Sequence, residues 1–269
     1  MELEQSYDAL IDAGLGVVAI SYDTVEIIRS FADRVGGFRY TLLADPQSEI
    51  IEDFAIRNPN RPEGTRGFGM AFPGTYIVDT DGIVQEKYFV QQHEMRYTTD
   101  TILLNTFGVG GGRRTEVQLP QFNFAAYASE DLVRPGNRVL LVADVELPER
   151  MHLYAPGSDY TAVDLRIIEN QNLRAGELIL PEPEILYLEP IDESVPVYHN
   201  GAQIQREITL SPEYREPTIE VQAVLEYQTC DDEICFPPGE FELTFELDVV
   251  QQDRQRAPEG IRHQGPRTL

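Results

Sequence analysis

Apolar positions recur with two different periods along the chain, and the period changes near residue 115. Before that point, apolar residues three and four apart predict helices over residues 2–13, 24–35, 46–55 and 95–107. Apolar runs between them predict strands at 15–20 and 38–44, and a hairpin of 76–78 with 83–90. The run at 15–20 is continuously apolar, which is typical of a strand buried on both faces of a parallel sheet. This part of the chain is therefore predicted to be an α/β unit.

After residue 115 the period is two, which indicates strands with one buried face. The strand candidates are residues 139–145, 163–168, 184–188, 204–210, 218–227 and 241–250. Turn residues separate them, and no helical stretch interrupts the series. The pattern predicts an antiparallel β-sandwich, so the chain is interpreted as two domains, residues 1–107 and 117–250.

Residues 108–116 lie between these domains and begin Gly-Val-Gly-Gly-Gly-Arg-Arg. A phosphate-binding loop is an alternative, but no Lys-Ser/Thr follows the glycines and no strand and helix frame them. A linker is the preferred interpretation. Residues 251–269 are rich in Arg, Gln, Pro and Gly, which predicts a disordered tail.

The two cysteines of the chain, Cys230 and Cys235, lie between the last two predicted strands, in the stretch Tyr-Gln-Thr-Cys-Asp-Asp-Glu-Ile-Cys-Phe-Pro-Pro. This places both thiols at the tip of a hairpin. A bridge between them closes so short a loop that it would stabilise the fold by only about 2 kcal/mol. An exposed short bridge is better suited to thiol exchange than to reinforcement.

Two other interpretations of this pair stay open. The bridge can be a structural hairpin disulfide. The thiolates can also bind zinc, although zinc needs two further ligands and the four histidines show no paired ligand spacing. Asp231, Asp232 and Glu233 lie between the cysteines and should raise the pKa of both thiols. We therefore expect the pair to depend on a partner for activation.

Composition limits the possible partners. The formal net charge is −25, so neither nucleic acid nor an anionic membrane surface is expected to bind. No apolar stretch reaches 18 residues, so no membrane insertion is expected. Neither a cofactor nor a metal is predicted. The first residues lack the features of a signal peptide, whereas a redox cysteine pair favours an oxidising compartment.

Residues 69–82 read Gly-Met-Ala-Phe-Pro-Gly-Thr-Tyr-Ile-Val-Asp-Thr-Asp-Gly, and residues 42–46 read Leu-Leu-Ala-Asp-Pro. These segments resemble the peroxiredoxin (AhpC/TSA) family, which has a thioredoxin-like fold, over residues 3–107. The resemblance implies a cis peptide bond at Phe72–Pro73, next to the cysteines of that family, although an ordinary trans proline before a strand is also consistent with the sequence.

The chain departs from this family in one respect that decides its chemistry. It begins inside the helix that carries the catalytic cysteine in the family, so the first strand and both peroxidase cysteines are missing. Without a thiolate, residues 1–107 have no nucleophile for a peroxide. Either the start codon was placed late or the domain is degenerate, and the first explanation would also account for a missing signal peptide.

Residues 117–250 resemble the N-terminal domain of the disulfide reductase DsbD, an immunoglobulin-like domain of the bacterial periplasm. The cysteine segment carries most of this resemblance, and residues 151–154, Met-His-Leu-Tyr, carry the rest. The resemblance implies that Cys230 and Cys235 are the redox pair and that Tyr154 shields them, although a tyrosine packed at the rim is equally consistent with the sequence. It also implies a cap loop, placed at residues 190–200 with Asp192, Glu193 and Tyr198.

Three functions follow from these patterns. The first is thiol:disulfide exchange through Cys230 and Cys235, with a thioredoxin-like protein or a membrane-embedded disulfide reductase as partner, in the periplasm by resemblance. The second is peroxide reduction in a longer gene product. The third is a non-enzymatic interaction module with a static disulfide.

Overall fold

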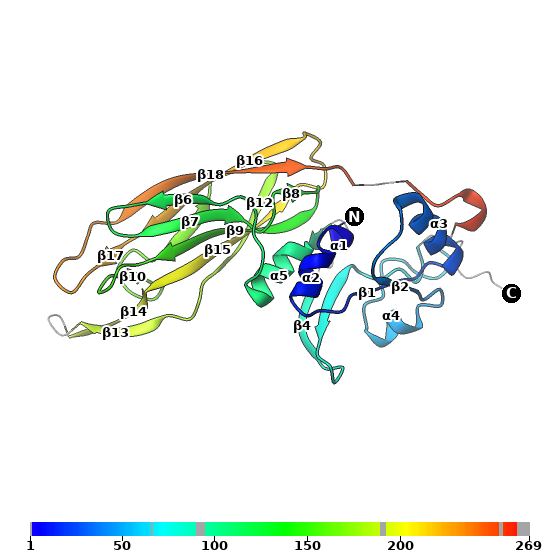
Figure 1. Cartoon of the computed structure of the whole chain (residues 1–269), viewed down its shortest axis with the longest axis horizontal. Coiled ribbons are helices and arrows are strands. Elements are labelled where there is room, and N and C mark those ends of the chain that lie inside the picture. The colour runs from blue at the N-terminus through cyan, green and yellow to red at the C-terminus, as the bar shows by residue number, and fades with distance from the viewer. Residues whose placement is uncertain (1, 66, 90–94, 189–191, 253–254, 263–269) are drawn as a thin grey trace. The chain divides into compact units, whose positions relative to one another are not determined.

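The computed structural model describes residues 2–65, 67–89, 95–188, 192–252 and 255–262 (Figure 1). Two compact units divide the chain, one made of residues 1–109 with 252–269 and the other of residues 110–251.

The first unit contains short helices and strands. The helices are α1 (Glu2–Gln5), α2 (Tyr7–Asp12), α3 (Val25–Val35), α4 (Glu49–Asp53) and α5 (Thr99–Phe107). The strands are β1 (Val18–Ser21), β2 (Thr41–Ala44), β3 (Gly74–Val78), β4 (Val84–Phe89) and β5 (Arg96–Tyr97). β1 pairs with β2 in parallel, and β3 pairs with β4 as an antiparallel hairpin.

Several boundaries in this unit follow the predicted signals. α3 begins after Thr24 and ends at Gly36, which has φ 91°, a left-handed conformation that glycine adopts without strain. The β3–β4 hairpin turns where expected, although Val90 lies outside the described residues. α5 begins later than predicted because Thr98 caps it, accepting a hydrogen bond from the Thr101 backbone N–H at 3.1 Å.

Three expectations about the first unit are wrong. β1 is not buried on both faces, since Val18 is 60% exposed and Ile20 is 42% exposed. An apolar run identifies a strand but not what packs on it, and β1 pairs only with β2 within the described chain. The helix predicted over residues 2–13 is broken at Ser6.

The third correction concerns Phe72–Pro73. None of the peptide bonds that the structure describes is cis. The trans form is the more stable state of an X–Pro bond by roughly 0.5–1 kcal/mol. In this form Phe72 packs edge-on against Phe89, with the ring centroids 5.9 Å apart.

The second unit is built from strands. They are β6 (Thr115–Gln118), β7 (Asn123–Ala128), β8 (Leu132–Val133), β9 (Asn137–Glu146), β10 (His152–Tyr154), β11 (Asp164–Ile167), β12 (Leu173–Ile179), β13 (Glu184–Leu188), β14 (Glu193–His199), β15 (Gly201–Leu210), β16 (Thr218–Tyr227), β17 (Thr229–Cys230) and β18 (Gly239–Val249). One sheet has the order β12-β15-β9-β7-β6, a second β11-β16-β18-β8 and a third β13-β14-β10-β17. The pairs are antiparallel except β18 with β8, which is parallel, so the prediction of a purely antiparallel sandwich is corrected at that edge.

A single hydrophobic core joins the first two of these sheets. In β16 and β18 most inward-facing side chains are buried, including Val221, Leu225 and Phe245, as the alternation predicts. They pack with side chains of the other sheet such as Leu141 and Ile204. Each such side chain stabilises the fold by about 1.5–3 kcal/mol on burial, and the core supports the long β16–β18 hairpin (Figure 1).

The segments predicted to be irregular are partly ordered. Thr115 and Glu116, at the end of the predicted linker, belong to β6 and pair with β7. Residues 255–262, within the predicted disordered tail, contain a short 3-10 helix, η2 (Glu259–Ile261), next to which Arg262 donates a hydrogen bond to the Ala257 carbonyl. Residues 263–269 lie outside the described chain.

Candidate functional site

A disulfide joins Cys230 and Cys235 at the tip beyond β16 and β18. Their Cα atoms are 4.1 Å apart, and a backbone bridge also connects the two residues. The environments of the two sulfur-bearing residues differ. Cys230 is 1% exposed and belongs to β17, whereas Cys235 is exposed. One end of the bond is therefore open to another thiol and the other end is held in the protein.

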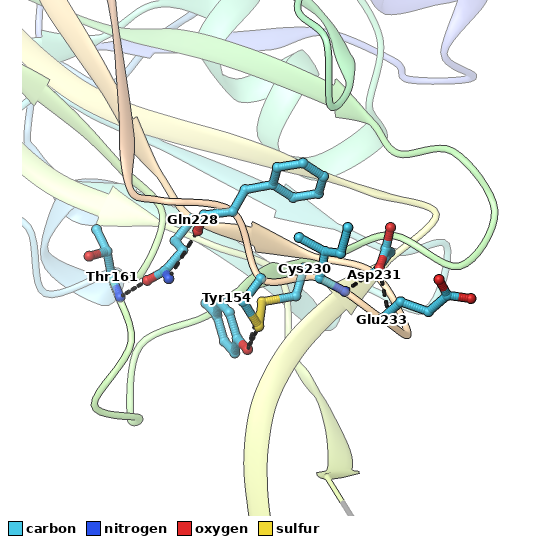
Figure 2. The surroundings of a disulfide bond; sticks show 9 residues. Tyr154, Thr161, Gln228, Cys230, Asp231 and Glu233 are labelled. Atoms are coloured by element: carbon cyan, nitrogen blue, oxygen red, sulfur yellow. Dashed lines mark hydrogen bonds between the residues drawn. A yellow bond between two sulfur atoms is a disulfide. The ribbon is translucent and has the colours of Figure 1, made fainter. Parts of the chain in front are cut away.

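Tyr154 lies under the disulfide. Its hydroxyl group is 3.2 Å from Cys230 Sγ and 3.8 Å from Cys235 Sγ (Figure 2). A disulfide sulfur has no proton, so the tyrosine is the donor in this contact. Tyr154 is fully buried, and its ring stacks on Tyr160 with the centroids 4.1 Å apart.

Burial is the main reason that the pKa of Tyr154 rises to about 12, with smaller contributions from Tyr160 and from the negative charge of Glu193. The side chain is therefore a neutral phenol at neutral pH and keeps the proton that it donates to sulfur. Val195 and Val197 of β14 complete the apolar wall around Tyr154 and Cys230.

The acidic residues of the tip have partners. The Asp231 carboxylate accepts hydrogen bonds from the backbone N–H groups of Glu233 and Ile234, both at 2.7 Å, and these bonds lower the pKa of Asp231. Arg150 forms ion pairs with Asp232 and with Glu233. The three acids therefore form a turn and an ion-paired rim around the sulfurs, as well as adding negative charge.

Gln228 ties the tip to the loop that follows β10. Its amide nitrogen donates to the Phe236 carbonyl at 3.2 Å, and its amide oxygen accepts from the Thr161 backbone N–H at 2.9 Å (Figure 2). The Tyr154 backbone is also held by two hydrogen bonds: its N–H donates to the Gln228 carbonyl, and its carbonyl accepts from the Val163 N–H. These bonds hold the phenol and the disulfide in one position.

The predicted site residues are placed as follows. Cys230, Cys235 and Tyr154 come together. Glu193 begins β14, close enough to act on the Tyr154 pKa. Asp192 is exposed and accepts a hydrogen bond from the Tyr187 hydroxyl at 2.7 Å. Pro73 belongs to the first unit, in a trans bond, and its assignment to a site rested on the cis form.

The segment predicted as a cap loop is mostly a strand. Residues 193–199 form β14, which pairs with β13 on one side and β10 on the other. The Tyr198 hydroxyl donates to the Pro181 carbonyl. Residues 193–199 are therefore a strand and not a loop, with Val195 and Val197 packed beside Tyr154 and Cys230, and residues 190–191 lie outside the described chain.

Four residues near the disulfide were not found from the sequence: Arg150, His152, Tyr160 and Gln228. His152 is 3% exposed and lies directly opposite Cys230 in the β10–β17 pair. Gln228 is two positions before Cys230, but its partners are distant in sequence. A search for polar residues flanking the cysteine and Tyr154 segments would have found three of the four.

In the described residues, no group of three or more His, Cys, Asp and Glu side chains is arranged to hold a metal ion. No helix of the described chain is long and apolar enough to cross a membrane.

Comparison with known proteins gives two family matches. The AhpC/TSA family matches residues 1–87. The family described as "Thiol:disulfide interchange protein DsbD, N-terminal" matches residues 122–246, which include the whole cysteine segment. The two halves of the chain are thus similar to two redox families.

Curated relatives match the first unit. "Alkyl hydroperoxide reductase C" of Staphylococcus saprophyticus is 31% identical over 87 residues, covering 31% of this chain and 42% of that protein. The corresponding protein of Staphylococcus haemolyticus is 30% identical with the same coverage. The chain therefore spans about two fifths of the length of these relatives.

The solved structures that match part of the chain include the DsbD N-terminal domain of Neisseria meningitidis in the reduced form. It is 18% identical, covers 40% of this chain and 77% of that one, and has a TM-score of 0.31. The N-terminal periplasmic domain of ScsB from Proteus mirabilis is 15% identical, covers 54% and 52%, and has a TM-score of 0.34.

Proposed function

We propose that this protein is a thiol:disulfide exchange protein, and that the Cys230–Cys235 bond is its reactive group. The observation that carries the proposal is the difference between the two ends of the bond. Cys235 is exposed, while Cys230 is buried against the Tyr154 hydroxyl. The match of residues 122–246 to a family of thiol:disulfide interchange proteins supports this kind of chemistry.

The proposed reaction begins at Cys235, because an incoming thiolate must reach the sulfur that it attacks. The partner sulfur bonds to Cys235 Sγ as the Cys230–Cys235 bond breaks, and the electron pair moves to Cys230 Sγ. The Tyr154 hydroxyl donates a hydrogen bond to this new thiolate. A second thiol of the partner then displaces Cys235, which leaves the partner oxidised and both cysteines reduced.

Partner and location belong to the same proposal. A thioredoxin-like protein or a membrane-embedded disulfide reductase has the paired thiols that the reaction needs. The resemblance to DsbD supports the periplasm, where disulfides persist, as the location of the exchange. We further propose that the second unit has an immunoglobulin-like topology and the first unit a thioredoxin-like fold.

Peroxide reduction is not proposed for the chain as given. The AhpC/TSA match favours that chemistry for the family, but both cysteines lie outside the matched residues 1–87. Extending the reading frame upstream would show whether a longer product carries the peroxidase thiols.

Single-cysteine variants test the proposed exchange. The probe is a purified thioredoxin-like protein whose second active-site cysteine is replaced by serine and whose first is activated as an aromatic mixed disulfide. Cys230→Ser retains the exposed thiol and should form the mixed disulfide at least about a hundredfold faster than Cys235→Ser, whose remaining thiol is buried. Equal rates would contradict the assignment of Cys235. A native disulfide that stays closed in excess dithiothreitol would make the bond structural and contradict the function.

A further inference from the structure

Three titratable side chains form a row across the sheet that carries the disulfide. His152 on β10 lies directly opposite His199 on β14 and directly opposite Cys230 on β17. Residues directly opposite one another in antiparallel strands point to the same face, with Cβ atoms roughly 5 Å apart. The row therefore runs from half-buried His199, through His152, to the buried sulfur of Cys230.

His152 is buried without a hydrogen-bond partner at one of its ring nitrogens. The side chain is 3% exposed, and Nε2 has neither solvent contact nor a partner. Its ring meets Tyr154 edge-on at 5.3 Å and lies 5.9 Å from the ring of His199. Buried polar atoms are nearly always bonded, so an unpartnered one next to a reactive group indicates a role in another state of the site.

Opening of the disulfide creates that other state. When a partner thiolate attacks Cys235, the buried Cys230 sulfur receives a full negative charge. Tyr154 supplies one hydrogen bond, but a buried anion is costly unless a positive charge or further donors compensate it. His152 is the adjacent base that can take up a proton and become that positive charge.

We propose that His152 takes up a proton when the Cys230–Cys235 bond opens, and so stabilises the Cys230 thiolate as an ion pair, with His199 as the route for the proton from water. The proposal rests on the exchange reaction argued above. The bond from the partner sulfur to Cys235 forms, the Cys230–Cys235 bond breaks, and the electron pair stays on Cys230. One proton moves from solvent to His152. His152 then stabilises the thiolate by its positive charge and forms no covalent bond in the reaction.

The groups that face His152 are consistent with such a switch. In the oxidised protein, burial and the neighbouring His199 lower the pKa of His152, while Asp232 and Asp231 act in the opposite direction. Arg150 offsets part of the charge of Asp232 through their ion pair. The ring is therefore neutral at pH 7 while the bond is closed. A thiolate on Cys230 adds a negative charge to those of Asp231 and Asp232, and so favours the protonated form of His152.

Proton NMR of the histidine rings tests this without any substitution. In the native protein, the His152 ring should titrate at higher pH when the disulfide is reduced than when it is oxidised, by at least about one pH unit, which is a tenfold change in proton affinity. A ring that titrates at the same pH in both states would overturn the proposal. A histidine that is merely structural would not respond to the state of the sulfur.

A second measurement follows the sulfur itself. In Cys235→Ser, Cys230 is the one thiol of the chain, and its thiolate absorbance near 240 nm can be titrated. Adding His152→Gln should move the midpoint of thiolate formation up by at least about one pH unit, a tenfold loss of thiolate at lower pH. Adding His199→Gln should move it less, because His199 is not directly opposite Cys230.

The outcomes separate this inference from the exchange function. If the native bond exchanges readily but His152→Gln leaves the thiolate midpoint unchanged, the role of His152 is wrong and the exchange function stands. If dithiols cannot open the native bond, the exchange function fails first. Circular dichroism of each variant shows whether it is folded, and the native-protein NMR comparison decides the matter if His152→Gln is not.

Discussion

The two units of this chain both match redox families, but they differ in what they can do. Residues 1–109 contain no cysteine, and the strands β1 and β2 carry exposed apolar side chains such as Val18 and Leu43. Residues 110–251 hold both cysteines above a continuous core. The likeness of the first unit to peroxide reductases therefore supplies no nucleophile. Chemistry follows from the site and not from the fold that surrounds it.

The same comparison holds for packing. Leu225 of β16, five positions before Cys230, is fully buried, whereas Val18 of β1 is mostly exposed. The tip that carries the disulfide is thus attached to well-packed strands. The proposed exchange would use this packing, because Tyr154 must stay close to Cys230 while the bond opens and closes.

The largest expected effect is on stability. Leu225→Ala should lower the free energy of unfolding of the second unit by about 2–5 kcal/mol, since it leaves a cavity in the core. Val18→Ala, the matched truncation in the first unit, should change stability by no more than about 0.5 kcal/mol. Urea unfolding followed by hydrogen exchange of β16 and β1 amides measures both. Equal losses would mean that the two units do not differ in packing as described.

The second effect is a loss of stability of the folded protein at alkaline pH. The pKa of Tyr154 is about 12 in the folded protein and about 10 in an unfolded chain. Above pH 10 the unfolded chain loses this proton while the folded protein keeps it, so stability falls as the pH rises. The loss from this residue should be about 1 kcal/mol between pH 10 and 11.

Tyr154→Phe should remove this part of the pH dependence, and urea unfolding of the oxidised protein at both pH values measures it. Tyr187→Phe is the matched control: the hydrogen bond to Asp192 raises the pKa of Tyr187, but the side chain is 54% exposed, so its contribution should be smaller than that of Tyr154. An unchanged pH dependence in Tyr154→Phe would show that the phenol is not held in a buried environment.

The smallest effect concerns the rim of the site. Arg150 pairs with Asp232 and Glu233, and all three side chains are more than half exposed. Arg150→Gln should change stability by less than about 1 kcal/mol, because exposed ion pairs contribute little. It should slow reduction by an anionic thiol such as glutathione by a few fold at low salt, because it removes the positive charge that is paired with Asp232 and Glu233 between the two cysteines.

Salt and a control variant isolate this effect. At about 1 M salt the difference should disappear. Arg166→Gln removes a similar exposed ion pair, with Glu226 on the β11–β16 strands, and should leave the rate of reduction unchanged. A rate loss that persists in high salt, or that Arg166→Gln also shows, would argue against a local charge effect at the tip.

The sequence predicted several long strands of the second unit, two of them with their bounds. Residues 184–188 and 218–227 were assigned the bounds that β13 and β16 have, because one face of each strand is more buried than the other. Strand β10 is absent from the predicted strands because its three residues, all buried, are too few to show a period. Strand β14 is absent from the predicted strands because the family resemblance implied a cap loop at residues 190–200.

Site residues could be predicted directly only where they are close to one another along the chain as well as in the fold. Cys230 and Cys235 share one segment, so they were found directly, and Tyr154 was found through a family resemblance. Arg150 is 82 residues from Asp232, and the register of β10 with β17 decides that His152 faces Cys230. No local pattern encodes these distances. The acidic tip was therefore predicted without the arginine that partly neutralises it.

The redox equilibrium of Cys230 and Cys235 tests the central claim most directly. The native protein would be equilibrated with a series of thiol and disulfide buffers, quenched by alkylation, and measured by mass shift. We predict a midpoint between about −200 and −270 mV, the range of proteins that exchange thiols with thioredoxin-like partners. A bond that stays closed below about −300 mV would be a structural disulfide and would contradict the proposed function.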